Sequence, residues 1–265
     1  MSGDTPDGAL PLQDEGGREV VVRFENIWKA FGRNIIYEGL DLDVHRGETL
    51  TIVGGSGTGK SVLLKCLLRL LIPDQGTITA FGETVTGRGE REMLPIRRRI
   101  GMLFQGAALF DSLTVRENVA YPLREHGWKD EEEIGDRVAT VLRMVNMPGI
   151  ESKHPAELSG GMKKRVGLAR AIAMEPEIIL YDEPTTGLDP TNVRHIDDLI
   201  LDLQARLGVT SIVVTHDMAS AFRISDRIAL LWDRAIAWVG ATDDVDTCGD
   251  PRVKGFVKGT LETDD

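Results

Sequence analysis

The chain has 265 residues, of which 42% are hydrophobic and 28% are charged, the proportions of a soluble globular protein with a sizeable core. The formal net charge of −11 would be repelled by a phosphate backbone, so we expect no nucleic-acid partner. No apolar run approaches the roughly 18 residues that a bilayer-spanning helix needs. If the protein works at a membrane, we expect another chain to cross it.

The chain termini differ in composition from the rest. Residues 1–18 are acidic and rich in Gly and Pro, without the basic start and apolar stretch of a signal peptide, so they predict a disordered tail. We expect the folded domain over 19–248 and a short tail over 249–265, which is polar apart from VKGFV. Cys66 and Cys248 have no metal-ligand spacing. Cys66 lies on the apolar face of an expected helix and is interpreted as a core residue in a protein of a reducing compartment.

Short β-rich runs recur along the chain, and several are continuously apolar, which indicates strands covered on both faces. They are residues 20–24, 49–53, 99–104, 177–182, 210–216, 227–232 and 235–240. Helical stretches separate some of them, at 61–71, 192–207 and 217–224. This pattern predicts an α/β fold with a mainly parallel sheet, in which the first two or three strands form a separate antiparallel layer.

Between about residues 106 and 175 the strands stop. Ile134, Val138, Val141, Leu142 and Val145 follow one another at helical spacing, after an acidic first turn that suits a helix N-terminus. A further helix is expected after Ser159. We interpret 106–175 as a helical lobe inserted into the α/β core.

A Gly-rich stretch, GGSGTGKS, follows the apolar run 49–53 and precedes an expected helix. This order of strand, loop and helix makes the G-x-x-x-x-G-K-S match a credible phosphate-binding loop, since successive backbone N–H groups at a helix N-terminus would surround phosphate oxygens. Lys60 would reach the β- and γ-phosphates, and Ser61 would offer its hydroxyl to Mg²⁺. The predicted nucleotide-binding residues are Gly54, Gly55, Ser56, Gly57, Thr58, Gly59, Lys60 and Ser61.

Two carboxylates end the apolar run IILYDEP. Asp182 is predicted to hold Mg²⁺ beside Ser61, and Glu183 to orient and deprotonate an attacking water. Two adjacent acids more often mark a solvated turn, but here they follow four apolar residues in a chain with a phosphate loop. Within the expected helical lobe, the stretch LSGGMKKR at 158–165 has a Ser suited to an N-cap and two glycines, which predict a second anion-binding helix end.

These motifs, with Gln105 after a strand, GLD at 187–189 and a His at the end of the run 210–216, resemble the nucleotide-binding subunit of an ABC transporter in kind and order. The likeness covers about residues 20 to 245. It implies a P-loop NTPase core with an antiparallel β layer and an inserted helical subdomain. It also implies ATP and Mg²⁺ as cofactors of an ATP-hydrolysing enzyme.

The resemblance implies roles for single residues. Phe31 would stack on adenine, Gln105 would sense Mg²⁺ and the lytic water, and His216 would face the γ-phosphate. Ser159, Gly160 and Gly161 match the signature that contacts the nucleotide of the opposite subunit, and Asp189 matches the aspartate of the dimer interface. Two ATPs would be sandwiched in a head-to-tail homodimer. Met162 stands where many members have Gln, but the serine and glycines are intact, so we expect activity.

The stretch RRRIGMLFQGAALFDSLTVRENVAYPLREH closely resembles the ATPase of Mla-type phospholipid transport systems, which include proteins linked to toluene tolerance. That resemblance implies an integral membrane permease, an MCE-domain lipid-binding protein and often a STAS-domain subunit. The chain would sit peripherally on the cytoplasmic side of the inner membrane and power phospholipid transport between inner and outer membranes.

Ala107, Ala108, Leu109 and Phe110 are expected to form an apolar patch that receives a short permease helix. The alternative is that they pack between the two lobes. Two rival functions remain: an importer of a small polar solute, which would share every catalytic residue, and a soluble ABC ATPase outside transport. The second rival usually carries a coiled-coil insert, CxxC pairs or tandem cassettes, none of which occurs here.

Overall fold

The structure, a computed structural model, describes residues 12–14 and 16–257 and contains two sheets. The larger, six-stranded sheet has the order β10-β9-β3-β8-β7-β6, with neighbours parallel except for β10 and β9. Its strands are β3 (Thr49–Val53), β6 (Ile100–Leu103), β7 (Ile178–Asp182), β8 (Thr210–Thr215), β9 (Arg227–Trp232) and β10 (Ala235–Ala241). β3, β6, β7 and β8 are buried along their whole length, which confirms the interpretation of continuous apolar runs as strands covered on both faces.

The second sheet is antiparallel, with the order β2-β1-β4-β5. Its strands are β1 (Val20–Phe31), β2 (Asn34–His45), β4 (Gln75–Ala80) and β5 (Glu83–Thr84). The expected antiparallel layer is therefore present, but its membership was predicted wrongly. Residues 49–53 belong to the parallel sheet as β3, while β2 and β4 complete the layer, because their half-exposed, alternating residues suit a sheet with one solvated face.

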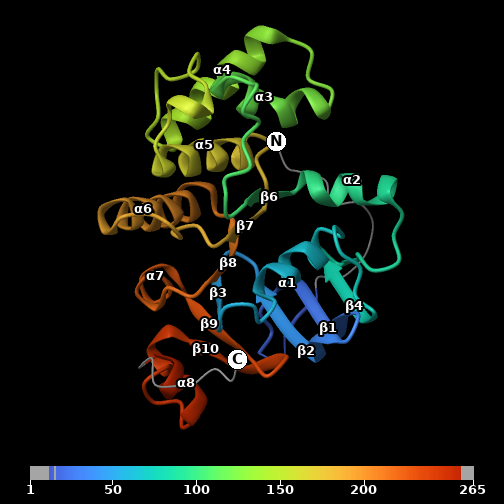
Figure 1. The fold of residues 1–265 in the computed structure, drawn as a ribbon. Coiled ribbons are helices and arrows are strands. Elements are labelled where there is room, and N and C mark those ends of the chain that lie inside the picture. Colours follow the sequence, from blue (N-terminus) through green and yellow to red (C-terminus); the bar gives the residue numbers. More distant parts are fainter. Residues whose placement is uncertain (1–11, 15, 258–265) are drawn as a thin grey trace.

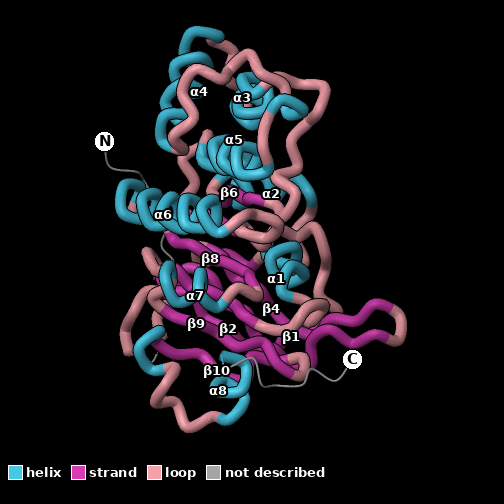
Figure 2. Tube along the Cα trace, turned by 60° about the vertical axis from the view of Figure 1, so that its left-hand side comes forward, coloured by secondary structure: helices cyan, strands magenta, loops and turns pink. Residues whose placement is uncertain are grey.

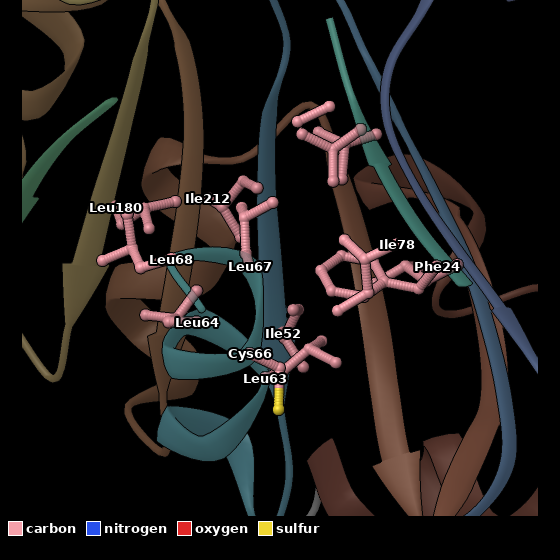
Figure 3. Packing of buried hydrophobic residues seen from close by; sticks show 14 of the residues in the cluster. Phe24, Ile52, Leu63, Leu64, Cys66, Leu67, Leu68, Ile78, Leu180 and Ile212 are labelled. Atoms are coloured by element: carbon pink, nitrogen blue, oxygen red, sulfur yellow. The ribbon is translucent and has the colours of Figure 1, made fainter. Parts of the chain in front are cut away.

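Helix α1 (Lys60–Leu67) lies between the two sheets and forms the centre of the core. Figure 3 shows Leu64 and Leu68 near Leu180 and Ile212 of the parallel sheet, with Phe24 and Ile78 of the antiparallel layer on the other side. Cys66 is buried in this cluster, which confirms its interpretation as a core residue. The helix ends at Leu67 and not at 71, since Arg69 adopts a left-handed φ of 53°.

The helical lobe stands at one end of the molecule (Figures 1 and 2), between β6 and β7 in the chain. It contains α3 (Val115–Glu125), α4 (Glu131–Met144) and α5 (Gly160–Ile172), with the short η1 (Pro155–Glu157) before α5. Asp130 caps α4 by accepting from the backbone N–H groups of Glu132 and Glu133, and the predicted apolar face of α4 is buried in the lobe's core. α2 (Glu90–Arg98) lies outside the lobe, just before β6.

The C-terminal part supplies helices that pack along the parallel sheet, and the first of them shares a buried cluster with the helical lobe. It includes α6 (Pro190–Leu207), α7 (Met218–Ile224), η2 (Thr242–Asp244) and α8 (Pro251–Val257). α8 falls in the stretch expected to be a polar tail, yet Val253 is buried in a cluster with Val245, and Trp238 packs against that cluster. Most of the expected N-terminal tail lies outside the described residues, but Gln13 forms a β-bridge with Glu19. No helix in the described part of the chain is long and apolar enough to cross a membrane.

Candidate functional site

The Gly-rich loop joins β3 to α1, and its lysine folds back over the loop's own backbone. Lys60 Nζ donates to the carbonyl oxygens of Gly54 and Gly55 at 2.9 and 2.8 Å. Gly59 has a φ of 100°, and a Cβ there would lie 2.3 Å from Ile36, so only glycine fits. Burial lowers the pKa of the Lys60 ammonium, against the opposing charges of Glu183 and Asp182. The loop thus presents a desolvated cation at a helix N-terminus, which suits phosphate binding.

Two side-chain oxygens that could bind a metal ion lie close together next to the loop, where β7 ends beside α1. Ser61 Oγ donates to Asp182 Oδ1 at 2.5 Å, although 121 residues separate them in the chain. Within the described residues there is no group of three or more His, Cys, Asp or Glu side chains that could hold a metal. A serine hydroxyl and one carboxylate are nevertheless the donor set that Mg²⁺ takes together with substrate phosphates. The residues present therefore fit a nucleotide-bound Mg²⁺.

Glu183 follows Asp182 in a strained backbone conformation, with a φ of 48°. Its Oε2 accepts from Thr186 Oγ1 at 2.9 Å and lies 2.9 Å from His216 Nδ1. Its Oε1 lies 3.9 Å from Lys60 Nζ. Polar groups from two loops therefore hold this carboxylate beside the lysine of the phosphate loop, where it is available as a proton acceptor.

The phosphate loop, Gln105, Glu183 and His216 line one cleft of about 470 Å³, a volume suited to a small-molecule ligand. The described lining residues are Ser56, Gly57, Gly59, Lys60, Ser61, Val62, Gln105, Glu183, Thr186 and His216. Gly54, Gly55 and Thr58 form the loop's frame behind it, where Thr58 Oγ1 donates to the Gly55 carbonyl. Phe31 is not among the lining residues; it lies at the end of β1, 46% exposed, with Lys29 Nζ 5.2 Å from its ring centroid.

The signature residues lie apart from this cleft. Ser159 caps α5 and accepts from the Met162 N–H at 3.3 Å. Asp189 caps α6 and accepts from Asn192 Nδ2 at 2.6 Å, a bond that lowers the pKa of its carboxyl group. The two helix starts are neighbours, because a Cβ at Gly161 would lie 2.9 Å from Asn192 Oδ1. Ser159, Gly160 and Asp189 are exposed, so these helix starts are accessible from outside the chain.

A second cavity, which we call the groove, has a volume of about 480 Å³ and opens beside the segment that follows Gln105. Apolar and aromatic side chains line it together with three arginines and a histidine; they include Met102, Phe104, Ala108, Phe110, Tyr121, Arg97, Arg98, Arg170 and His126. The rings of Phe110 and Tyr121 lie 4.9 Å apart, and the two side chains are 43% and 42% exposed. The groove therefore combines an exposed aromatic pair with positive charge.

The expected patch at 107–110 divides between the two alternatives. Ala107 is buried against α5 and Leu109 packs on the lobe's core, whereas Ala108 and Phe110 line the groove. The division follows from two consecutive left-handed residues, Ala107 and Ala108, with φ of 61° and 48°. Arg170 stabilises this turn by donating to the Ala107 and Ala108 carbonyls at 2.8 and 2.7 Å.

Sequence reasoning missed Lys164, which lies between the cleft and the lobe. Its buried ammonium donates to the carbonyl oxygens of Gln105 and Glu183. Burial lowers its pKa, while the charges of Asp182 and Glu183 act in the opposite direction. The repeated lysines of LSGGMKKR gave no signal, because only the fold brings the two carbonyls to Lys164.

Comparison with known proteins agrees with this geometry. The family model described as "ABC transporter" matches residues 37–186. The probable ribonucleotide transport ATP-binding protein Mkl of Mycobacterium leprae is 40% identical over 253 residues, which cover 96% of this chain and 71% of Mkl. The intermembrane phospholipid transport ATP-binding protein MlaF of Haemophilus influenzae is 39% identical over 239 residues, 90% of each chain.

A solved structure shares the fold. It is a dimeric ATP-binding cassette in a post-hydrolysis state with bound ADP and Pi, and it superposes with a TM-score of 0.77 at 33% identity. The match covers 83% of this chain and 98% of that cassette.

Proposed function

The chain belongs to the ABC transporter family and hydrolyses ATP, and from this premise we propose that it powers phospholipid transport between the inner and outer membranes through a separate permease. The observation that carries the proposal is the likeness to MlaF, which spans nearly the full length of both chains. The Mla-like stretch around the groove also supports it. The ATPase of a small-solute importer would share every catalytic residue, so only sequence outside the catalytic residues can distinguish the two functions.

The chemistry follows from the residues around the cleft. Lys60 would bind the β- and γ-phosphates, and Ser61 and Asp182 would hold Mg²⁺, which neutralises charge on the phosphates when bound. Glu183 Oε2, oriented by Thr186 and His216, would accept the proton of the attacking water. Gln105 would contact the same water and the metal from the other wall. Phe31, exposed at the end of β1, would stack on the adenine outside the cleft.

A homodimer would complete each site. Ser159, Gly160 and Gly161 lie at the start of α5 outside the cleft of their own chain, and Ser159 and Gly160 are exposed while Gly161 is buried. They would meet a nucleotide bound to a second copy. Asp189, at the neighbouring helix start, would lie in the same interface. The dimeric state of the similar cassette supports this head-to-tail arrangement. Two ATPs would then be held between two phosphate loops and two signatures.

The groove is the proposed contact with the permease. Its exposed aromatic pair and its arginines suit a short amphipathic helix that presents apolar and acidic side chains. The chain would therefore associate peripherally with the cytoplasmic side of the inner membrane. By the resemblance to Mla-type systems, which often contain a STAS-domain subunit, the full assembly would include an MCE-domain lipid-binding protein.

A second candidate is an importer of a small polar solute, which the name of the similar Mkl protein favours. Both candidates share the cleft and differ in the permease. The deciding experiment is to tag the chain, purify it in mild detergent, and identify the proteins and lipids that co-purify. A permease with an MCE-domain protein and bound phospholipid supports the proposal; a permease for a polar solute overturns it.

A further inference from the structure

Lys164 lies in the second turn of α5 and is only 5% exposed. Its Nζ donates to the Gln105 carbonyl oxygen at 2.5 Å and to the Glu183 carbonyl oxygen at 3.0 Å. A buried charge is costly unless it is hydrogen-bonded, and bonds from a charged donor are strong. The two carbonyls therefore help to stabilise this buried ammonium, and the ammonium in turn holds both peptide units in place.

The two peptide units belong to different walls of the cleft. Gln105 follows β6 and Glu183 follows β7, and both side chains line the cleft. The backbone of Glu183 is in the left-handed region, so it keeps this conformation only where surrounding contacts hold it. Lys164 supplies one such contact from α5, the helix that begins at the exposed signature residue Ser159.

We propose that Lys164 is a positioning residue for ATP hydrolysis, which ties the backbones of Gln105 and Glu183 to α5 so that both side chains are aimed at the nucleotide. It touches neither nucleotide nor water and acts through two carbonyl groups. The inference rests on the proposed roles of Gln105 and Glu183 in the cleft. The N-terminus of α5 would meet the nucleotide of the opposite subunit. The position of α5 would therefore also set the geometry of Gln105 and Glu183 in this subunit's own site.

The same side of α5 makes further contacts with the segment that leads from the cleft to the groove. Gly167 and Arg170 follow Lys164 at intervals of three residues, which places them along one side of the helix. A Cβ at Gly167 would lie 3.0 Å from Leu103 and 3.2 Å from the Ala107 carbonyl, so the backbones approach closely there. Arg170 holds the next two carbonyls. Residues on this side of α5 thus contact residues 103–108 continuously, and Lys164 is the one that lies nearest the cleft.

The test uses Lys164→Met in the full chain, within the purified transporter complex. Methionine keeps a long side chain but removes both hydrogen bonds. The matched control is Lys163→Met, since Lys163 is the adjacent, half-buried lysine whose side chain makes no hydrogen bond to the described residues. The measurements are Kd for ATP, KM, kcat and the melting temperature.

We expect Lys164→Met to bind ATP with Kd and KM close to those of the control, and to lose roughly 10²-fold in kcat, as misplacement of catalytic groups does. A merely structural role would lower the melting temperature and weaken binding together. A kcat equal to that of Lys163→Met overturns the inference, as does a change in Kd without a change in kcat.

Lys164→Gln serves where the methionine variant does not fold, because its amide still donates to a carbonyl. An intermediate kcat with unchanged KM supports the inference; loss of the melting transition in both variants overturns it in favour of a folding role. A wild-type complex that hydrolyses no ATP counts against the proposed function. An active wild type beside an equally active Lys164→Met counts against this inference alone.

Discussion

The nucleotide cleft and the groove share one short segment, residues 102–110, yet they are built in different ways. Gln105 of this segment lines the cleft, whereas residues on either side of it line the groove. The cleft is made of fixed polar geometry: a folded-back lysine, a strained glutamate and a serine–carboxylate pair. The groove is an apolar surface with an exposed aromatic pair and with arginines from two helices, α2 and α5. The polar geometry of the cleft suits ATP hydrolysis, whereas the apolar surface of the groove is the proposed site of contact with the permease.

Glu183→Gln gives the largest expected effect and separates the two regions most sharply. The amide keeps the size of the side chain but cannot accept the proton of water, so kcat should fall by roughly 10²–10⁴-fold. ATP binding and association with the permease should stay near wild type, because Lys60 and the groove are intact. Steady-state hydrolysis and nucleotide binding measure this, and hydrolysis at the wild-type rate would remove Glu183 from its role.

Phe110→Ala should do the reverse. Removing half of the exposed aromatic pair should weaken association with the permease by roughly tenfold or more, as loss of an aromatic anchor does. ATP binding should not change. Leu94→Ala is the control, since Leu94 is 52% exposed on α2 and does not line the groove. Equal co-purification of both variants with the permease would count against the groove as the docking surface.

Arg170→Met should affect the connection between the regions. The turn at Ala107 and Ala108 would lose two charge-assisted hydrogen bonds, which costs about 1–3 kcal/mol of the free energy of unfolding. We expect ATP binding to persist while stimulation of hydrolysis by the permease falls several-fold. The exposed Arg143→Met on α4 provides the comparison. Stimulation that is the same in both variants would show that Arg170 takes no part in coupling.

Asp197→Asn should leave both regions' functions unchanged and alter only stability. Asp197 is buried in α6, where burial raises the pKa of its carboxyl group from 3.8 to about 6. The folded state therefore binds more protons than the unfolded state between about pH 4 and 6, and the free energy of unfolding falls as pH rises through that window.

The asparagine variant lacks this fall, so above pH 6 it should be more stable than wild type by the order of 1–2 kcal/mol, with no gain below about pH 4. Urea unfolding across this pH range measures the difference. The exposed Asp136→Asn on α4 should show no such trend. A gain that is independent of pH would mean that Asp197 is not neutral in the folded protein.

The cleft was largely predictable because its residues follow continuous apolar strands in a fixed order. β3 and β7 could be recognised from their composition, and the phosphate loop and the two carboxylates come directly after them. The strands β2 and β4 could not, since their mixed polarity resembles loop sequence and several register shifts interrupt the pairing of β1 with its neighbours.

The remaining features depend on contacts that no local pattern encodes. Lys164 has partners 59 and 19 residues away in the chain. The turn at Ala107 buries this alanine and exposes the next one, Ala108, although the two adjacent residues are of the same type. The short helix α8 forms where Val253 can be buried beside Val245, a contact that the short apolar run VKGFV does not by itself predict.

The most direct test of the central claim is ATP-dependent phospholipid transfer by the complex reconstituted in proteoliposomes with a fluorescent phospholipid. We predict transfer that requires ATP and Mg²⁺ and that is lost with Glu183→Gln while the complex stays assembled. ATP-driven uptake of a small polar solute, with no movement of phospholipid, would contradict the account.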